Sequence, residues 1–114
     1  MTKQLVLYGP TVSTFTRICA IVGQEAGLSW QIIPTASGSK EMAAHHPFMR
    51  SPAAYIDGLH FYESMAICSY IDRAHNDGAL HAQTPEAEAR MWQWANVAAN
   101  YVFSGTGDTL VMPR

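Results

Sequence analysis

Hydroxyl side chains gather at the predicted start of a helix, directly after a short apolar strand. Residues 5–8 are apolar enough for a buried strand, and Gly9 and Pro10 break it. Ser13 and Thr14 then stand where helical periodicity begins. The first N–H groups of a helix have no partner within it, and the helix dipole places partial positive charge at the same end. An anion such as a thiolate can be held there.

A hydroxyl at this place can play two roles. It can cap the helix by accepting a hydrogen bond from a backbone N–H, which needs no ligand. It can also donate a hydrogen bond to a bound thiolate, which together with the helix dipole lowers the pKa of the thiol from about 8.5. The thiolate is the nucleophilic form, so the second role would activate the thiol of a substrate.

A second stretch can pair with the backbone of an extended ligand. Ser51 precedes Pro52 at the start of a predicted strand, a place where proline is compatible with a sheet. A cis bond between the two residues would leave the N–H and C=O of Ser51 free for a peptide-like ligand. The alternative is an ordinary trans proline at a strand edge, which is the more common form.

A third stretch, Glu63 and Ser64, opens another predicted helix. Ser64 with its own N–H can hold a carboxylate, and Glu63 can pair with an ammonium group. An α-amino acid head group presents both charges. The alternative is a capping serine preceded by a solvated acid. Lys40 and Arg50 can meet a second carboxylate, or they can remain solvated.

The periodicity and the turn residues predict an α/β (α+β) domain. Asp57 and Gly58 are a two-residue hairpin signal between two strands. The series βαβαββα gives a mixed sheet of four strands with helices packed on it, which is the order of a thioredoxin-like domain. The predicted elements are a strand at 4–8, a helix from 14 to about 26, a strand at 30–33, a short helix at 40–45, strands at 53–56 and 59–62, and a helix from 64 to about 76.

The chain is predicted to divide into a domain at 1–78, a linker at 79–83 and a second part at 84–114. Thr84 caps a new helix and Pro85 suits its first position. One amphipathic helix cannot bury its apolar face alone. The second part is therefore expected to be the start of an incomplete, all-helical domain.

Composition narrows the function classes. The 114 residues are 48% hydrophobic with a net charge of −2, which predicts a folded core and argues against nucleic acid and anionic membranes as partners. We see no membrane-span pattern and no signal peptide, so we expect a cytoplasmic protein. Cys19 and Cys68 form no CxxC motif and are interpreted as small core residues. His45 and His46 lack further ligands at metal spacing, so we expect no metal.

Taken in order, the three stretches resemble the cytosolic glutathione transferases. Residues 13–17, Ser-Thr-Phe-Thr-Arg, are similar to the start of the first helix in the serine-type classes, which are the phi and theta-like classes and many bacterial relatives. Residues 46–53, His-Pro-Phe-Met-Arg-Ser-Pro-Ala, resemble the family segment Asn-Pro-Phe-Gly-Lys-Val-Pro-Ala. Residues 63–67 match the family's Glu-Ser-x-Ala-Ile.

The resemblance implies a cytoplasmic homodimer that uses glutathione as co-substrate and attacks a small apolar electrophile. Ser13 would bond the thiolate, with Tyr8, the place of the activating tyrosine in other classes, as the alternative. The backbone of Ser51, before a cis Pro52, would pair with the cysteinyl residue of glutathione. The remaining assignments are Glu63 and Ser64 for the γ-glutamyl end, Lys40 and Arg50 for the glycyl carboxylate, and Trp94, Ala98 and Tyr101 for the electrophile.

The chain also departs from the family. Met49 replaces a glycine, Ser51 replaces an apolar residue, and the helical part is much shorter than usual. A non-catalytic glutathione-transferase-like binding or docking module is therefore the alternative function. A glutaredoxin-like exchanger is a further alternative, although the motif position carries Ser13 and not cysteine.

Overall fold

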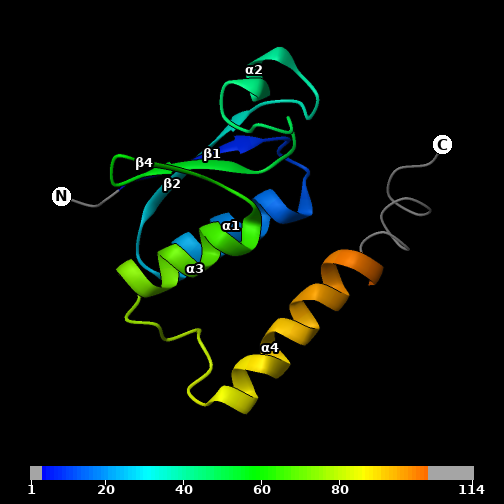
Figure 1. Cartoon of the computed structure of the whole chain (residues 1–114). Helices are drawn as coiled ribbons and strands as arrows, with labels where there is room; N and C mark the ends of the chain where they lie inside the picture. Colours follow the sequence, from blue (N-terminus) through cyan, green and yellow to red (C-terminus); the bar gives the residue numbers. More distant parts are fainter. Residues whose placement is uncertain (1–3, 103–114) are drawn as a thin grey trace. The chain divides into compact units, whose positions relative to one another are not determined.

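A computed structural model describes residues 4–102, and it divides after Leu80 into two compact units (Figure 1). The first unit holds a four-stranded mixed sheet in the order β2-β1-β3-β4. β1 runs parallel to β2 and antiparallel to β3, and β3 runs antiparallel to β4. Its elements are β1 (Gln4–Gly9), α1 (Thr14–Glu25), β2 (Ser29–Pro34), α2 (Lys40–Ala43), β3 (Ala53–Ile56), β4 (Leu59–Tyr62) and α3 (Ser64–His75). The predicted βαβαββα order and thioredoxin-like fold are confirmed.

The helices of the first unit lie on both faces of the sheet. Figure 1 shows α1 and α3 together on one face and α2 on the other. Residues alternate between the two faces of a strand, and Leu5 and Leu7 of β1 are fully buried in the main core. Ile67 and Ile71 of α3 join them there. The core therefore lies between the sheet and the pair α1 and α3.

The β3–β4 hairpin is fastened to the far end of α3. Asp57 and Gly58 have φ values of 55° and 78°, and two-residue hairpin turns of type I′ need positive φ at both positions. Asp57 Oδ2 accepts a hydrogen bond from Tyr70 Oη at 2.6 Å and lies 2.7 Å from His75 Nε2. The bond to the Asp57 carboxylate raises the pKa of Tyr70. The turn thus fixes both the register of the hairpin and the position of α3.

A buried carboxylate anchors the last segment of the first unit. Asp72, which is 2% exposed, accepts hydrogen bonds from Leu80 N at 3.0 Å and from Asn76 Nδ2 at 2.9 Å. A buried charge needs such partners to offset its desolvation. These bonds hold the segment after α3 in place up to the boundary between the units.

The second unit begins with the predicted helix. Thr84 caps α4 (Pro85–Val97) by accepting a hydrogen bond from Ala87 N at 3.2 Å, and Pro85 takes the first position. The helix continues into the π-helix η1 (Ala98–Val102). Within residues 4–102, no helix has the length and apolar character to cross a membrane.

Gly9, at the end of β1, is a point of close approach. A Cβ atom added to it would lie 2.5 Å from Thr16 Oγ1 in α1 and 3.1 Å from Ser51 Cβ. Thr16 is fully buried, and its Oγ1 has no hydrogen-bond partner among the described residues. The missing side chain of Gly9 therefore allows α1 and the segment before β3 to meet at one end of the sheet.

We predict that Gly9→Ala lowers the free energy of unfolding by about 1–3 kcal/mol, because the new methyl group overpacks this point. Thr16→Ala alone should cost at most about 1 kcal/mol, because removal of a buried, unpaired hydroxyl offsets part of the loss of one buried methyl group. The double variant should lose clearly less than the sum. Chemical denaturation measures all three values, and strictly additive losses would contradict the contact.

Candidate functional site

The sheet register brings the three motif stretches to one end of the first unit. Ala53 at the start of β3 pairs with Tyr8 near the end of β1 and with Tyr62 at the end of β4. α1 begins shortly after β1 ends, and α3 begins shortly after β4 ends. The helix starts and the segment before β3 must therefore lie at the same end of the sheet.

Ser13 caps α1 and can still act as a donor. Its Oγ accepts a hydrogen bond from Thr16 N at 3.3 Å, and its backbone N–H donates to Pro10 O at 3.1 Å. The hydroxyl hydrogen takes no part in the bond from Thr16. The capping role predicted for Ser13 is confirmed, and this geometry is compatible with a hydrogen bond to an anion.

Ser51 stands just outside the sheet. The pairing of β3 with β1 begins at Ala53, two residues later, and the Ser51-Pro52 peptide bond is cis. Ser51 Oγ lies 3.0 Å from Ser37 Oγ, so the segment before β3 is joined to the loop after β2. A second bond, from Gly38 N to Met49 O at 2.6 Å, joins the same two segments.

Glu63, and not Ser64, occupies the cap position of α3. The interpretation of Ser64 as the cap is wrong, because α3 already begins at Ser64. Glu63 has a φ of 77° and makes no side-chain hydrogen bond to the first turn. A left-handed φ is uncommon for a residue with a long side chain, and such outliers gather at functional sites. The first turn of α3 therefore lacks a side-chain cap and keeps its affinity for an anion.

His46 holds the carboxylate of Glu63, a role that the sequence analysis missed. The ring is 1% exposed, and its Nδ1 accepts a hydrogen bond from Phe48 N at 3.0 Å. The ring hydrogen must then be on Nε2, which donates to Glu63 Oε2 at 3.1 Å. The Glu63 side chain is 67% exposed, so it remains open to a ligand. The sequence did carry a signal for this role, because His46 stands where the family segment Asn-Pro-Phe-Gly-Lys-Val-Pro-Ala has asparagine.

Tyr8, the alternative to Ser13, packs on the other face of the sheet from the main core. It alternates with the buried Leu7, and its ring stacks on His45 with 3.7 Å between centroids and 12° between planes. The choice between Tyr8 and Ser13 stays a prediction.

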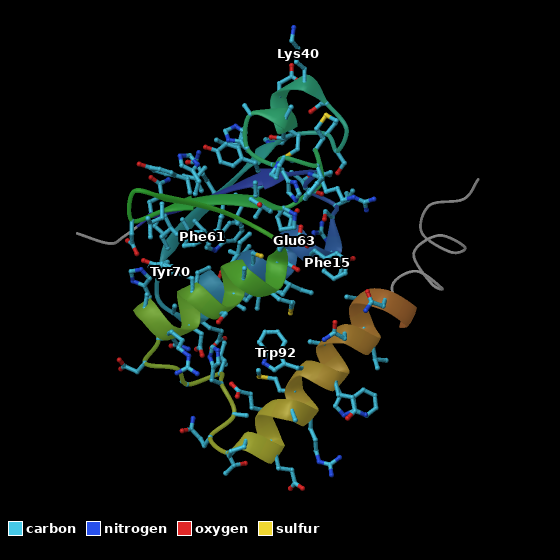
Figure 2. All side chains as sticks on the ribbon, in the orientation of Figure 1. Phe15, Lys40, Phe61, Glu63, Tyr70 and Trp92 are labelled. Carbon is cyan, nitrogen blue, oxygen red and sulfur yellow. The ribbon has the colours of Figure 1, made fainter. Side chains whose placement is uncertain are left out.

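The remaining predicted residues are Lys40 and Arg50 of the first unit and Trp94, Ala98 and Tyr101 of the second. Lys40 and Arg50 are exposed, and Figure 2 shows the Lys40 side chain pointing away from Glu63. Trp94 and Ala98 are exposed residues of the second unit, and the side chain of Tyr101 lies outside the described part of the chain. The residues described include no group of three His, Cys, Asp or Glu side chains placed to hold a metal ion.

Residues 7–84 match the family of glutathione S-transferase N-terminal domains. The chain belongs to this family. It is 34% identical over 99 residues to glutathione S-transferase 1 of Zea mays, an alignment that covers 82% of this chain and 46% of the maize protein. The chain thus spans about half the length of the curated relatives it matches.

Solved structures share the fold. A maize glutathione S-transferase I in complex with an atrazine glutathione conjugate aligns with a TM-score of 0.75 and 29% identity, covering 96% of this chain and 55% of that one. A theta class glutathione S-transferase from Xanthomonas axonopodis pv. citri, with glutathione bound, has a TM-score of 0.74 and 23% identity, covering 89% and 50%. The second likeness supports the fold alone.

Met49, which stands where the family has glycine, has a φ of 56°. We predict that Met49→Gly raises the free energy of unfolding by about 0.5–1 kcal/mol, because glycine adopts this conformation without the penalty of a side chain. Met65→Gly, within α3, is the matched control and should lower it by about 1 kcal/mol or more. Thermal unfolding measures both changes, and a loss of stability in Met49→Gly would refute the assignment of strain.

Proposed function

We propose that this chain is the glutathione-binding part of a serine-type glutathione transferase, which activates the glutathione thiol for attack on an apolar electrophile. The observation that carries the proposal is the end of the sheet where Ser13, Ser51 and Glu63 come together through the register of β1, β3 and β4. Family membership supports it, and so does the related maize structure that holds a glutathione conjugate.

The ends of glutathione suit the two sides of this site. Its γ-glutamyl end carries an ammonium and a carboxylate, which Glu63 and the uncapped start of α3 at Ser64 would bind respectively. The backbone of Ser51, outside the β3 ladder, would pair with the cysteinyl residue. Lys40 and Arg50, both exposed, would approach the glycyl carboxylate.

The proposed chemistry is activation of the bound thiol. Ser13, oriented by the bond from Thr16 N, would donate its hydroxyl hydrogen to the sulfur at the positive end of α1. Both effects favour the thiolate over the thiol. The thiolate then forms a bond to an electrophilic carbon. Either the bond from that carbon to a leaving group breaks and the leaving group takes its electron pair, or a π bond of that carbon breaks and its electron pair moves to the neighbouring atom. Trp94, Ala98 and Tyr101 of the second unit are proposed to contact the electrophile, in a cytoplasmic homodimer.

We predict that the Glu63 carboxylate is required for glutathione binding. Glu63→Gln should weaken it by about 10-fold to 100-fold, as expected for a lost charge-assisted bond. Glu63→Gly should weaken it at least as much without loss of stability, because glycine accepts the φ of 77°. His46→Asn retains an acceptor for Phe48 N but cannot reach Glu63, so a smaller loss of about 3-fold to 10-fold is expected.

Calorimetric titration of the chain with glutathione measures these affinities. The matched control is Glu41→Gln, which removes an exposed carboxylate from α2. Undiminished binding by Glu63→Gly would refute the carboxylate's role, and no binding by the unmodified chain at millimolar glutathione would count against the proposed function.

We also predict that Ser13, and not Tyr8, sets the pKa of the bound thiol. The ultraviolet absorbance of the thiolate, titrated with pH in the complex with glutathione, should give a value below the free value of about 8.5. Ser13→Ala should return it toward that value with binding retained, whereas Tyr8→Phe should leave it low. The opposite pattern would assign the role to Tyr8.

A further inference from the structure

We propose that Cys19 and Cys68 form a redox-modification site, a dithiol that a peroxide converts into an intrachain disulfide between α1 and α3. The two residues are 49 positions apart in sequence, and their Sγ atoms lie 3.9 Å apart. α1 and α3 pack against each other on the same face of the sheet (Figure 1). A disulfide bond has an S–S length of about 2 Å, so the two sulfurs must approach each other by nearly 2 Å to form it.

The two thiols differ in a way that assigns their roles. Cys19 is fully buried, whereas Cys68 is half-buried and is therefore the more accessible of the two residues. In the dithiol, the Cys68 thiol donates to the Cys19 sulfur. Once Cys68 ionises, the Cys19 S–H can donate to its thiolate instead, which lowers the pKa of Cys68 and, together with burial, raises that of Cys19. Cys68 is therefore the more readily formed thiolate and the reacting residue, and Cys19 is the resolving residue.

The oxidation balances with hydrogen peroxide as the oxidant. The Cys68 thiolate attacks one peroxide oxygen, the O–O bond breaks, and hydroxide leaves, so that Cys68 becomes a sulfenic acid. The Cys19 sulfur then attacks the Cys68 sulfur, and the S–O bond breaks. The proton of the Cys19 thiol goes to the departing oxygen, which leaves as water. In total, two thiols and one peroxide give one disulfide and two waters.

This site touches the proposed glutathione site. The Cys19 thiol donates a weak hydrogen bond to the backbone carbonyl of Ser64, with 3.8 Å between sulfur and oxygen. A disulfide has no S–H, so the first residue of α3 loses this donor when the pair is oxidised. Oxidation should also draw α3 toward α1 near the residues assigned to the γ-glutamyl end, a consequence that rests on the proposed function.

The test is oxidation of the reduced chain with one equivalent of hydrogen peroxide. The chain has only two cysteines, so intact mass and thiol alkylation account for every thiol. We expect a mass lower by two hydrogen atoms, no free thiol, a peptide that joins Cys19 to Cys68, and full recovery with dithiothreitol. Cys19→Ser should instead trap oxygen on Cys68, and Cys68→Ser should leave Cys19 largely unreacted.

Two results would overturn the proposed site. One is sulfinic acid on Cys68 together with a Cys19 thiol that is still free to be alkylated after denaturation. The other is a disulfide between two copies of the chain, seen on a non-reducing gel. The link to Ser64 is measured by titration of the reduced and oxidised chain with glutathione, in which about 5-fold weaker binding by the oxidised form is expected. Equal affinities would refute the link. A reduced chain that does not bind would count against the proposed function while leaving the thiol result intact.

Discussion

The register of the mixed sheet decides where every group of the candidate site lies. β3 pairs antiparallel with β1 on one side and β4 on the other, and Ala53 stands opposite both Tyr8 and Tyr62. A slip of one residue would move the buried face of β3 to the other side of the sheet. The register therefore holds the starts of α1 and α3 beside the segment that carries Ser51.

The two helix starts at this end are built differently, and the difference has a chemical consequence. Ser13 satisfies part of the first turn of α1 through its own oxygen and keeps a hydroxyl hydrogen to donate. Glu63 leaves the first turn of α3 without a side-chain acceptor. In the proposed function, one helix start would donate to the sulfur of glutathione and the other would offer its N–H groups to the γ-glutamyl carboxylate.

The sequence predicted local features well and contacts between distant residues poorly. The hairpin at Asp57 and Gly58 and the capping role of Ser13 depend on neighbouring residues, and both are found in the structure. The buried His46 and its bond to Glu63 depend on how a loop packs against a helix start, which no spacing encodes.

The two cysteines show the same limit. The prediction that Cys19 is a small core residue is confirmed by its burial. Its closeness to Cys68 arises only because α1 and α3 cover the same face of the sheet, with residue 19 and residue 68 on their facing sides. Periodicity places each cysteine on a buried side of its own helix, but it does not give the position of α1 relative to α3 along the helix axes.

The backbone strain in the first unit is concentrated where the site is. Asp57 and Asp77 also have positive φ, but short polar residues tolerate this conformation in turns. Met49 and Glu63 have long side chains, and each left-handed residue of this kind costs about 1–2 kcal/mol. Glu63 gains a carboxylate aligned by His46 and an open helix start. Met49, whose carbonyl accepts from Gly38 N, holds the loop that leads to Ser51. The free energy lost at Met49 and Glu63 must be offset elsewhere in the first unit. The hydrophobic core of Leu5, Leu7 and α3 supplies that stabilisation.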